Sequence, residues 1–256
     1  MESWKDQGIV LSARPHGENG AIVSLLTEEQ GRHAGYVRGA QGTKLRGSLE
    51  VGNIVDASWQ SRTSDSLGSF SLELSRGTAA LFMQDPIKLS ALQSACALCD
   101  EALPEREKHA GLYHGLCALF ETLESDIWGA AYVMWEIAFL KELGFSLDLT
   151  QCAGGGDNGA LTYVSPKTGR AVSAEQGEPY KDKLLNLPPF LKPESGEINE
   201  QGVLEGLRMT GYFLEHWVFT HHSRGVPPAR LLFQERFAKT VESSHLEENK
   251  EYHAAG

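Results

Sequence analysis

The first third of the chain alternates short apolar runs with turn residues. Five such runs, β-branched or alternating in character, lie at residues 7–13, 21–26, 32–38, 53–59 and 70–74. Runs of this length and period are typical of short β-strands. Five strands joined by loops predict a small OB-type barrel, a fold that commonly binds single-stranded nucleic acid. We therefore expect an OB-fold nucleic-acid-binding domain over residues 1–80.

After Asp85 and Pro86 the apolar positions recur every three or four residues, the period of amphipathic helices. The pattern and its capping residues predict helices at residues 88–103, 105–123, 127–143, 199–220 and 228–241. Together they indicate a helical domain over residues 81–242.

Residues 150–195 lack the helical spacing of apolar positions and interrupt the predicted helices. Within this segment, residues 161–164 and 170–173 flank the turn sequence Pro166 to Gly169 and predict a small β-hairpin. Residues 243–256 are polar, and we expect a disordered tail there. The predicted fold is therefore α+β and multidomain: a five-stranded OB-type barrel followed by a helical domain with an inserted hairpin.

Charge is distributed unevenly along an acidic chain whose formal net charge is −11. Residues 1–80 carry eight Lys or Arg and nine Asp or Glu, whereas residues 81–256 carry fifteen and twenty-five. Within the first part, residues 30–49 hold four cations, five glycines and no acid. A protein that coats nucleic acid with a wholly basic surface is excluded, and any such binding is local.

Lysine and arginine are the side chains that contact phosphates, and aromatic rings stack on bases. The predicted nucleic-acid-binding residues all lie in the β-rich part: Lys5, Arg14, Arg32, Tyr36, Arg38, Lys44, Arg46 and Arg62. Trp4 and Trp59 are either further stacking platforms or barrel core. The plainer alternative for the cations is a solvated hairpin that aids solubility.

Other chemistry is sparse. Cys96 and Cys99 have the spacing of half a zinc site, but they lie on an apolar helical face with no second pair, so buried thiols are expected. His216, His221 and His222 either ligate a metal or complement a helix C-terminus. No known catalytic motif is present, and we expect no enzyme activity. A metal-dependent hydrolase using the histidines is the corresponding alternative.

The first residues lack the basic start and apolar block typical of a signal peptide, so we expect none, and no apolar run reaches the roughly 18 residues needed to cross a membrane. Its four cysteines suit reduced thiols. We therefore expect a cytoplasmic, nucleoid-associated protein.

Several short motifs, in order, resemble the DNA repair protein RecO family. In the first part they include residues 8–11, 17–18, 26–27, 31–32 and 38–40, with Leu49, Gly52, Leu67 and Gly68. In the middle they include residues 163–166, 169–172 and 187–191. The resemblance covers most of residues 5–235, and the order and spacing of these motifs are more specific than any one of them.

The resemblance implies a recombination mediator rather than an enzyme. Such a protein binds single- and double-stranded DNA, anneals complementary strands and helps to load the recombinase onto DNA coated with single-strand-binding protein. The implied partners are RecR and the C-terminal tail of single-strand-binding protein. Many members hold zinc with four cysteines in the middle segment, but here only Cys152 remains and Gly155 stands where another would be. We therefore expect no zinc and a hairpin held by packing alone.

A rival hypothesis is a protein–protein adaptor, in which the basic loop of the barrel binds an acidic partner. Strand annealing without partner proteins separates this hypothesis from DNA binding.

Overall fold

The computed structural model describes residues 2–63, 66–192 and 196–254, and the side chains of Lys44, His245 and residues 247–254 lie outside that description. By its internal contacts the chain divides into two compact units. The first is Met1–Phe120 with Pro227–Phe233, and the second is Glu121–Val226 with Gln234–Gly256. Residues 81–120, which the sequence assigned to the helical domain, thus group with the barrel.

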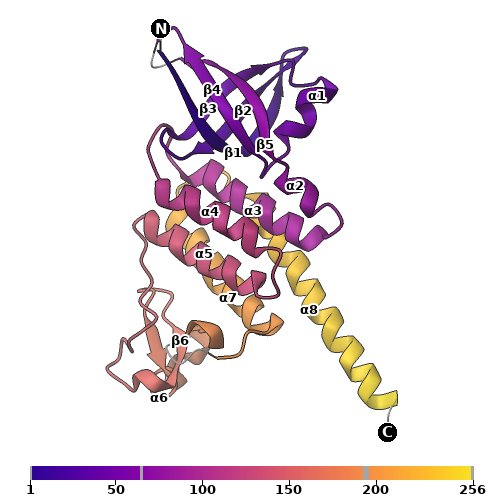
Figure 1. The fold of residues 1–256 in the computed structure, drawn as a ribbon. Helices are drawn as coiled ribbons and strands as arrows, with labels where there is room; N and C mark the ends of the chain where they lie inside the picture. The colour runs from indigo at the N-terminus through magenta and orange to yellow at the C-terminus, as the bar shows by residue number, and fades with distance from the viewer. Residues whose placement is uncertain (1, 64–65, 193–195, 255–256) are drawn as a thin grey trace. The chain divides into compact units, whose positions relative to one another are not determined.

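Five strands of the first unit close into a barrel in the order β1-β2-β3-β5-β4 (Figure 1). Their bounds are Glu2–His16 (β1), Gly20–Thr27 (β2), Gly31–Arg38 (β3), Ile54–Ser61 (β4) and Ser69–Arg76 (β5). Neighbouring strands are antiparallel, except that β3 and β5 are parallel. The predicted five-stranded OB-type barrel is confirmed.

Strand β1 is longer than its apolar run indicated. Residues 2–7, which are mostly polar, pair with β4 in a continuous antiparallel register from Glu2 opposite Ser61 to Gln7 opposite Asp56. These residues are half-buried or exposed. Their side chains therefore carry little hydrophobic signal, and only the pairing reveals the strand.

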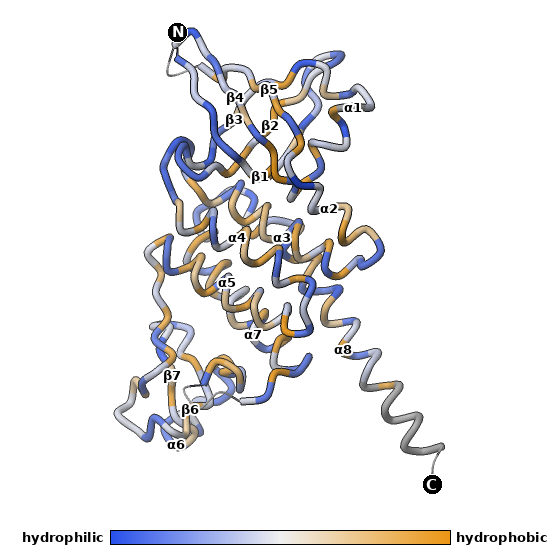
Figure 2. Tube along the Cα trace, viewed as in Figure 1, coloured by the Kyte–Doolittle hydropathy of each residue, from blue (hydrophilic) through white to orange (hydrophobic). Residues whose placement is uncertain are grey.

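The barrel core is formed by inward-facing aliphatic residues and three aromatic side chains. Its buried members include Val10, Val23, Leu25, Val37, Val55, Trp59, Phe70 and Leu72, with Trp4 packed against them. Figure 2 shows the hydrophobic stretches among the barrel strands and in the helices α3, α4, α5 and α7. Of the two roles considered for Trp4 and Trp59, the structure therefore supports packing in the barrel core and not stacking on bases at the surface.

The first unit also contains helical segments. Among them are α1 (Thr43–Arg46), α2 (Thr78–Leu81), α3 (Pro86–Ala102) and most of α4 (Ala110–Thr122). Helix α3 begins near its predicted start because the Asp85 carboxylate accepts hydrogen bonds from the backbone N–H groups of Ile87 and Lys88. Proline at the first helical position supports the same boundary.

The helix predicted from Glu105 begins only at Ala110, so that boundary is wrong. The backbone N–H of Arg106 donates instead to the carbonyl oxygen of Arg32 on β3, at 2.7 Å. Arg106 takes a left-handed conformation, with φ of +64°. Hydrogen bonding to the barrel therefore replaces the first helical turn in this segment.

The second unit is mainly helical and carries a small sheet. Its elements are α5 (Trp128–Glu142), β6 (Leu161–Val164), β7 (Ala171–Ser173), α6 (Ala174–Gly177), β8 (Leu185–Asn186) and α7 (Glu200–Phe213), followed by a π-helical turn at Leu214–Val218. The sheet has the order β7-β6-β8. The predicted hairpin corresponds to β6 and β7, whereas the two-residue strand β8 was not predicted.

Helix α8 (Pro228–Ala254) continues well beyond the predicted end at residue 241. The expectation of a disordered tail is therefore wrong for residues 243–254, and residues 255 and 256 lie outside the described part. The segment has no proline or glycine before its last residue and is rich in glutamate, which is compatible with a helix. Polarity alone did not distinguish a solvated helix from disorder. None of the helices in the described ranges has the length and apolar character needed to cross a bilayer.

Candidate nucleic-acid interface

Strand β3 separates its side chains cleanly between the barrel interior and the outer surface. His33, Gly35 and Val37 are buried, whereas Tyr36 is half-buried and Arg38 is exposed. Successive side chains of a strand point to opposite faces, so the candidate residues on β3 share the outer face. The alternation places Tyr36 and Arg38 near the end of the strand.

Arg32, on the same outer face, is engaged by the polypeptide after α3. Its Nε donates to the carbonyl oxygen of Leu103 at 2.7 Å, and its Nη1 lies 3.7 Å from Asp100 and 3.6 Å from Glu105. Only 18% of its side chain is exposed. The guanidinium therefore stabilises the packing of the helix against the barrel, and we remove Arg32 from the candidate interface.

Arg14 on β1 faces the same helix. Its Nη2 lies 3.3 Å from Asp100 and 3.7 Å from Glu101. Although the side chain is largely exposed, its charge is compensated by two carboxylates. Two of the predicted cations thus face acidic α3, and the single patch expected from the sequence does not form.

Lys5 is exposed on β1 but lies among acids. It lines a shallow hollow with Asp6, Asp56 and Glu73. Their negative charges make this part of the barrel unfavourable for phosphate. Lys44 belongs to α1, and its side chain lies outside the described residues.

Three predicted residues remain together at the end of β3, and we call them the β3-end surface: Tyr36, Arg38 and Arg46. Both arginines are exposed, and neither has an ion pair within the ranges that the structure describes. The strand register runs from Tyr36 to Ser69 on β5 and on to Gln60 on β4, and Arg62 follows two residues later. Because β5 runs parallel to β3 and antiparallel to β4, those two residues lead toward the start of β3, so Arg62 lies away from Arg38 and does not belong to this surface.

Tyr36 covers a glycine on the neighbouring strand. A Cβ atom on Gly20 would lie only 2.2 Å from the Tyr36 hydroxyl oxygen, so the ring needs glycine at that position. The ring of His16 meets the Tyr36 ring edge to face, with 6.2 Å between centroids. Gly20 is also the register partner of Arg38, so ring and guanidinium are adjacent on the outer face.

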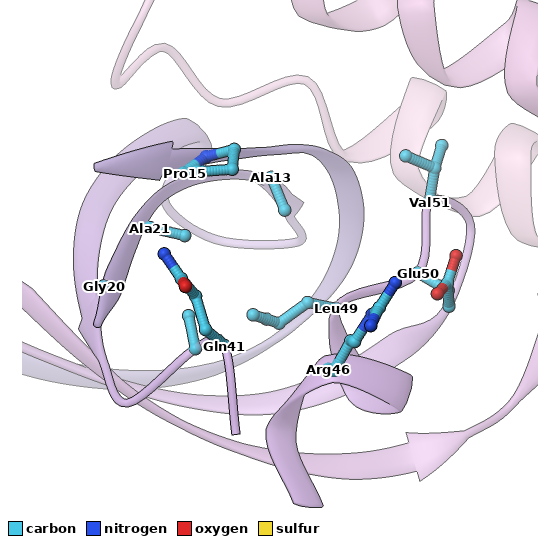
Figure 3. Close-up of a pocket in the computed structure, with 10 residues that line it drawn as sticks. Ala13, Pro15, Gly20, Ala21, Gln41, Arg46, Leu49, Glu50 and Val51 are labelled. Carbon is cyan, nitrogen blue, oxygen red and sulfur yellow. The ribbon is translucent and has the colours of Figure 1, made fainter. Parts of the chain in front are cut away.

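A pocket of about 450 Å³ opens beside α1 at this end of the barrel. Its walls include Ala13, Pro15 and Ala21 on one side and Leu49 on the other. Figure 3 shows the Gln41 side chain directed into the space near Ala21, and Arg46 beside Glu50 at another edge. Pattern analysis singled out Arg46 here but missed Gln41 and Leu49, because the wall comes from three separate stretches of chain.

Inside the barrel, His33 is enclosed by aromatic rings. The centroids of Trp59 and Trp4 lie 4.7 and 5.0 Å from that of His33. Neither ring nitrogen has a hydrogen-bond partner among the described residues. Burial, assisted by the positive charge of Arg106, lowers the pKa of His33 to about 4. The imidazole is therefore neutral at physiological pH and belongs to the core.

Cys152 is the one middle-segment cysteine, and its thiol is bound within the small sheet. The backbone N–H of Ser173 donates to Sγ at 3.2 Å, and Sγ lies 3.5 Å from the Ser173 hydroxyl. Burial opposes ionisation, but hydrogen bonds from Ser173, Gly154 and Gly156 outweigh it and lower the pKa of Cys152 to about 7. Hydrogen bonds therefore tie this segment together, in addition to the packing that we expected.

Among the residues that the structure describes, no set of ligands is assembled for the metal-dependent alternative. His216 stacks on Tyr212, with 3.9 Å between ring centroids, and its Nδ1 lies 2.9 Å from the Tyr212 carbonyl oxygen. His221 and His222 are exposed. Within the described ranges, no three His, Cys, Asp or Glu side chains are grouped so that they could hold a metal ion. The residues around Cys152 likewise do not fit the four-cysteine zinc site implied by the resemblance.

A closed five-stranded barrel of this strand order, with cations and a tyrosine at one end, defines a protein of the OB-barrel class. Two family models extend the assignment over most of the chain. "Recombination protein O N terminal" matches residues 1–77, and "Recombination protein O C terminal" matches residues 83–224. The chain belongs to the RecO family of DNA repair and recombination proteins.

Curated relatives agree with this assignment over nearly their whole length. The chain is 51% identical to the DNA repair protein RecO of Rhodospirillum centenum over 245 residues, which cover 95% of this chain and 98% of that protein. It is 47% identical to the protein of the same name from Rhodospirillum rubrum over 246 residues (93% and 98%). The corresponding protein of Caulobacter vibrioides is 48% identical over 238 residues (92% and 98%).

Proposed function

We propose that this chain is a recombination mediator that binds single- and double-stranded DNA through the β3-end surface. The observation that carries the proposal is the exposure of Arg38 and Arg46 near Tyr36, neither of which has an ion pair with any residue that the structure describes. Arginine contacts phosphates without regard to sequence, and a tyrosine ring stacks on any base. Such a surface holds a strand while its base edges remain available for pairing.

Annealing follows from the same physics. Two strands held on cationic surfaces are brought together with their mutual phosphate repulsion reduced, and base pairing supplies the sequence specificity. The protein then needs no bond-making chemistry, and we propose that it is not an enzyme. Family membership supports the further steps: help in loading the recombinase, with RecR and the C-terminal tail of single-strand-binding protein as partners. DNA binding would place the protein at the nucleoid.

The test is a fluorescence anisotropy titration of a labelled single-stranded oligonucleotide with the full chain at several salt concentrations. Arg38→Ala combined with Arg46→Ala removes both described cations of the surface. We expect roughly tenfold weaker binding and a salt dependence flatter by about one unit of log–log slope.

A matched control removes two cations that are paired with acids in the second unit. Lys181 lies 2.7 Å from Glu178, and Lys239 lies 2.6 Å from Glu235. Lys181→Ala with Lys239→Ala changes the net charge equally and should leave affinity and slope near those of the parent chain. Equal loss in both double variants would reduce the effect to net charge and remove the β3-end surface from the proposal.

Annealing of complementary oligonucleotides without partner proteins completes the test. We expect the parent chain to accelerate annealing and the Arg38→Ala, Arg46→Ala variant to do so less. A folded parent chain that neither binds nor anneals DNA would favour the adaptor hypothesis.

A further inference from the structure

We propose that the pocket beside α1 holds a single unstacked nucleobase of a bound strand. The inference rests on the proposed DNA binding and adds a base-sized site to a surface otherwise argued from phosphate contacts. The site consists of the walls formed by Ala13, Pro15, Ala21 and Leu49, with Gln41 directed into the space.

The size and the walls suit a flat heterocycle. Pockets for small organic ligands have volumes of roughly 300–1,000 Å³, and this one, at about 450 Å³, lies in the lower part of that range. Its walls are small or aliphatic, and both Ala21 and Leu49 are buried members of the barrel core. Apolar walls of this kind contact the two faces of a base and leave its edge free for polar groups.

Gln41 supplies a polar group for that edge. Its amide offers both a hydrogen-bond acceptor and two donors, so it can pair with the edge of any base after a rotation of the side chain. Gln41 is exposed and makes no side-chain hydrogen bond with the residues that the structure describes. The amide is therefore available to a ligand without the loss of an existing contact.

The charges at the rim indicate that the entering group is neutral. Arg46 and Glu50 both line the pocket, so its rim carries one charge of each sign and as a whole favours neither an anion nor a cation. The two side chains form no ion pair among the described residues, and Arg46 stays available to a phosphate. A base is neutral at pH 7, whereas the carboxylate of an acidic peptide would meet Glu50. The phosphates stay outside, where Arg46 lines the pocket and the exposed Arg38 is the register partner of Gly20, another lining residue.

A base can enter only when it is neither paired nor stacked. The pocket therefore favours single-stranded DNA over a duplex, in which each base would first have to be extruded at a cost of a few kcal/mol. Capture of one base also fixes the strand beside Tyr36, so that the next base can stack on the ring.

The experiment compares two oligonucleotides of equal length: oligothymidylate and one composed of abasic sites. Both carry the same phosphates, so the ratio of their affinities isolates the bases. For the parent chain we expect roughly tenfold preference for the base-containing strand, since a held base contributes about 1–3 kcal/mol.

Two variants connect that preference to the pocket. Ala13→Leu fills the space from β1, and Gln41→Ala removes the amide from an exposed position with little risk to folding. Gln60→Ala is the matched control, an exposed glutamine on β4 that does not line this pocket. The preference should fall about threefold or more in both pocket variants and stay unchanged in the control. Affinity for the abasic strand should stay constant in all three.

The outcomes separate the two proposals. Equal affinity of the parent chain for both oligonucleotides overturns the base pocket while leaving phosphate binding intact. So does a preference that persists in folded Ala13→Leu and Gln41→Ala. If neither oligonucleotide binds, the proposed function fails, and the pocket inference fails with it.

Discussion

His33 is a titratable residue placed where a hydrophobic residue would be expected. Its ring contributes to the packing of Trp4 and Trp59, yet both nitrogens are buried without partners in the described structure. Such a ring is tolerated while it is neutral, because a charged imidazolium would lose its hydration without gaining a partner. The residue therefore couples the stability of the barrel to pH.

The direction of this coupling follows from the lowered pKa of about 4 in the folded chain, against 6.5 for the unperturbed residue. Protonation favours the unfolded state, so stability is complete above pH 6.5 and is lost as the pH falls toward 4. The loss over that window should approach about 3 kcal/mol. His33→Leu should remove most of this dependence, as measured by urea unfolding at a series of pH values. The same slope in parent and variant would contradict the argument.

Gly31 shows how one missing side chain permits a contact. It has a φ of +66°, and a Cβ atom there would lie 1.8 Å from the carbonyl oxygen of Glu107. Gly39 has a similar φ of +71° but nothing within 4 Å of the corresponding position. The two glycines therefore share a left-handed backbone conformation. They differ in whether a Cβ atom at that position would meet a neighbouring atom.

Gly31→Ala should be the more destabilising of the two substitutions. Gly39→Ala carries only the cost of the left-handed conformation, about 1–2 kcal/mol. Gly31→Ala adds a clash with backbone, and we expect a further loss of about 2 kcal/mol or more. Thermal or urea unfolding of both variants measures the difference. Equal losses would mean that the segment at Glu107 moves away freely.

At the scale of elements, a shared carboxylate links the barrel to α3. Asp100, whose side chain is only 8% exposed, lies close to both Arg14 and Arg32. The two arginines differ in burial, at 61% and 18% exposed. Exposed ion pairs contribute little to stability, whereas loss of one partner from a buried pair is costly.

We therefore expect Arg32→Ala to lower the free energy of unfolding by about 2 kcal/mol and Arg14→Ala by less than about 1 kcal/mol. Urea unfolding monitored by tryptophan fluorescence distinguishes them. Neither substitution should flatten the salt dependence of DNA binding. A flattened slope in folded Arg32→Ala would restore that residue to the interface.

At the scale of the molecule, the acidic chain confines phosphate binding to a few cations. The β3-end surface contributes two arginines, and Lys44 on α1 lies nearby in the chain. Neutralising about three phosphates on a single strand predicts a log–log salt slope near −2. A titration series in potassium chloride measures it. A slope near zero, or one twice as steep, would mean that other surfaces bind the strand.

Much of the architecture was predictable because it depends on local periodicity. Alternating apolar positions determine which face of each strand packs inward, and the three-to-four spacing identifies α3, α5 and α7. Capping residues such as Asp85 and Asn199 locate helix starts, since their side chains accept the otherwise unpaired N–H groups. Errors occurred where backbone groups found distant partners, as at Arg106, or where polarity was mistaken for disorder, as in α8.

The sequence by itself determined the barrel, the helical segments, the family and the inventory of cations, because composition and period are properties of the chain. Only the tertiary structure decided how those cations are used. Arg14 and Arg32 meet α3 from about seventy or more residues away in sequence, whereas the strand register leaves Arg38 at the end of β3 and places Arg62 toward the start of that strand. The sequence shows where each cation lies along the chain. Whether its charge is compensated depends on which carboxylates the fold brings within a few ångströms.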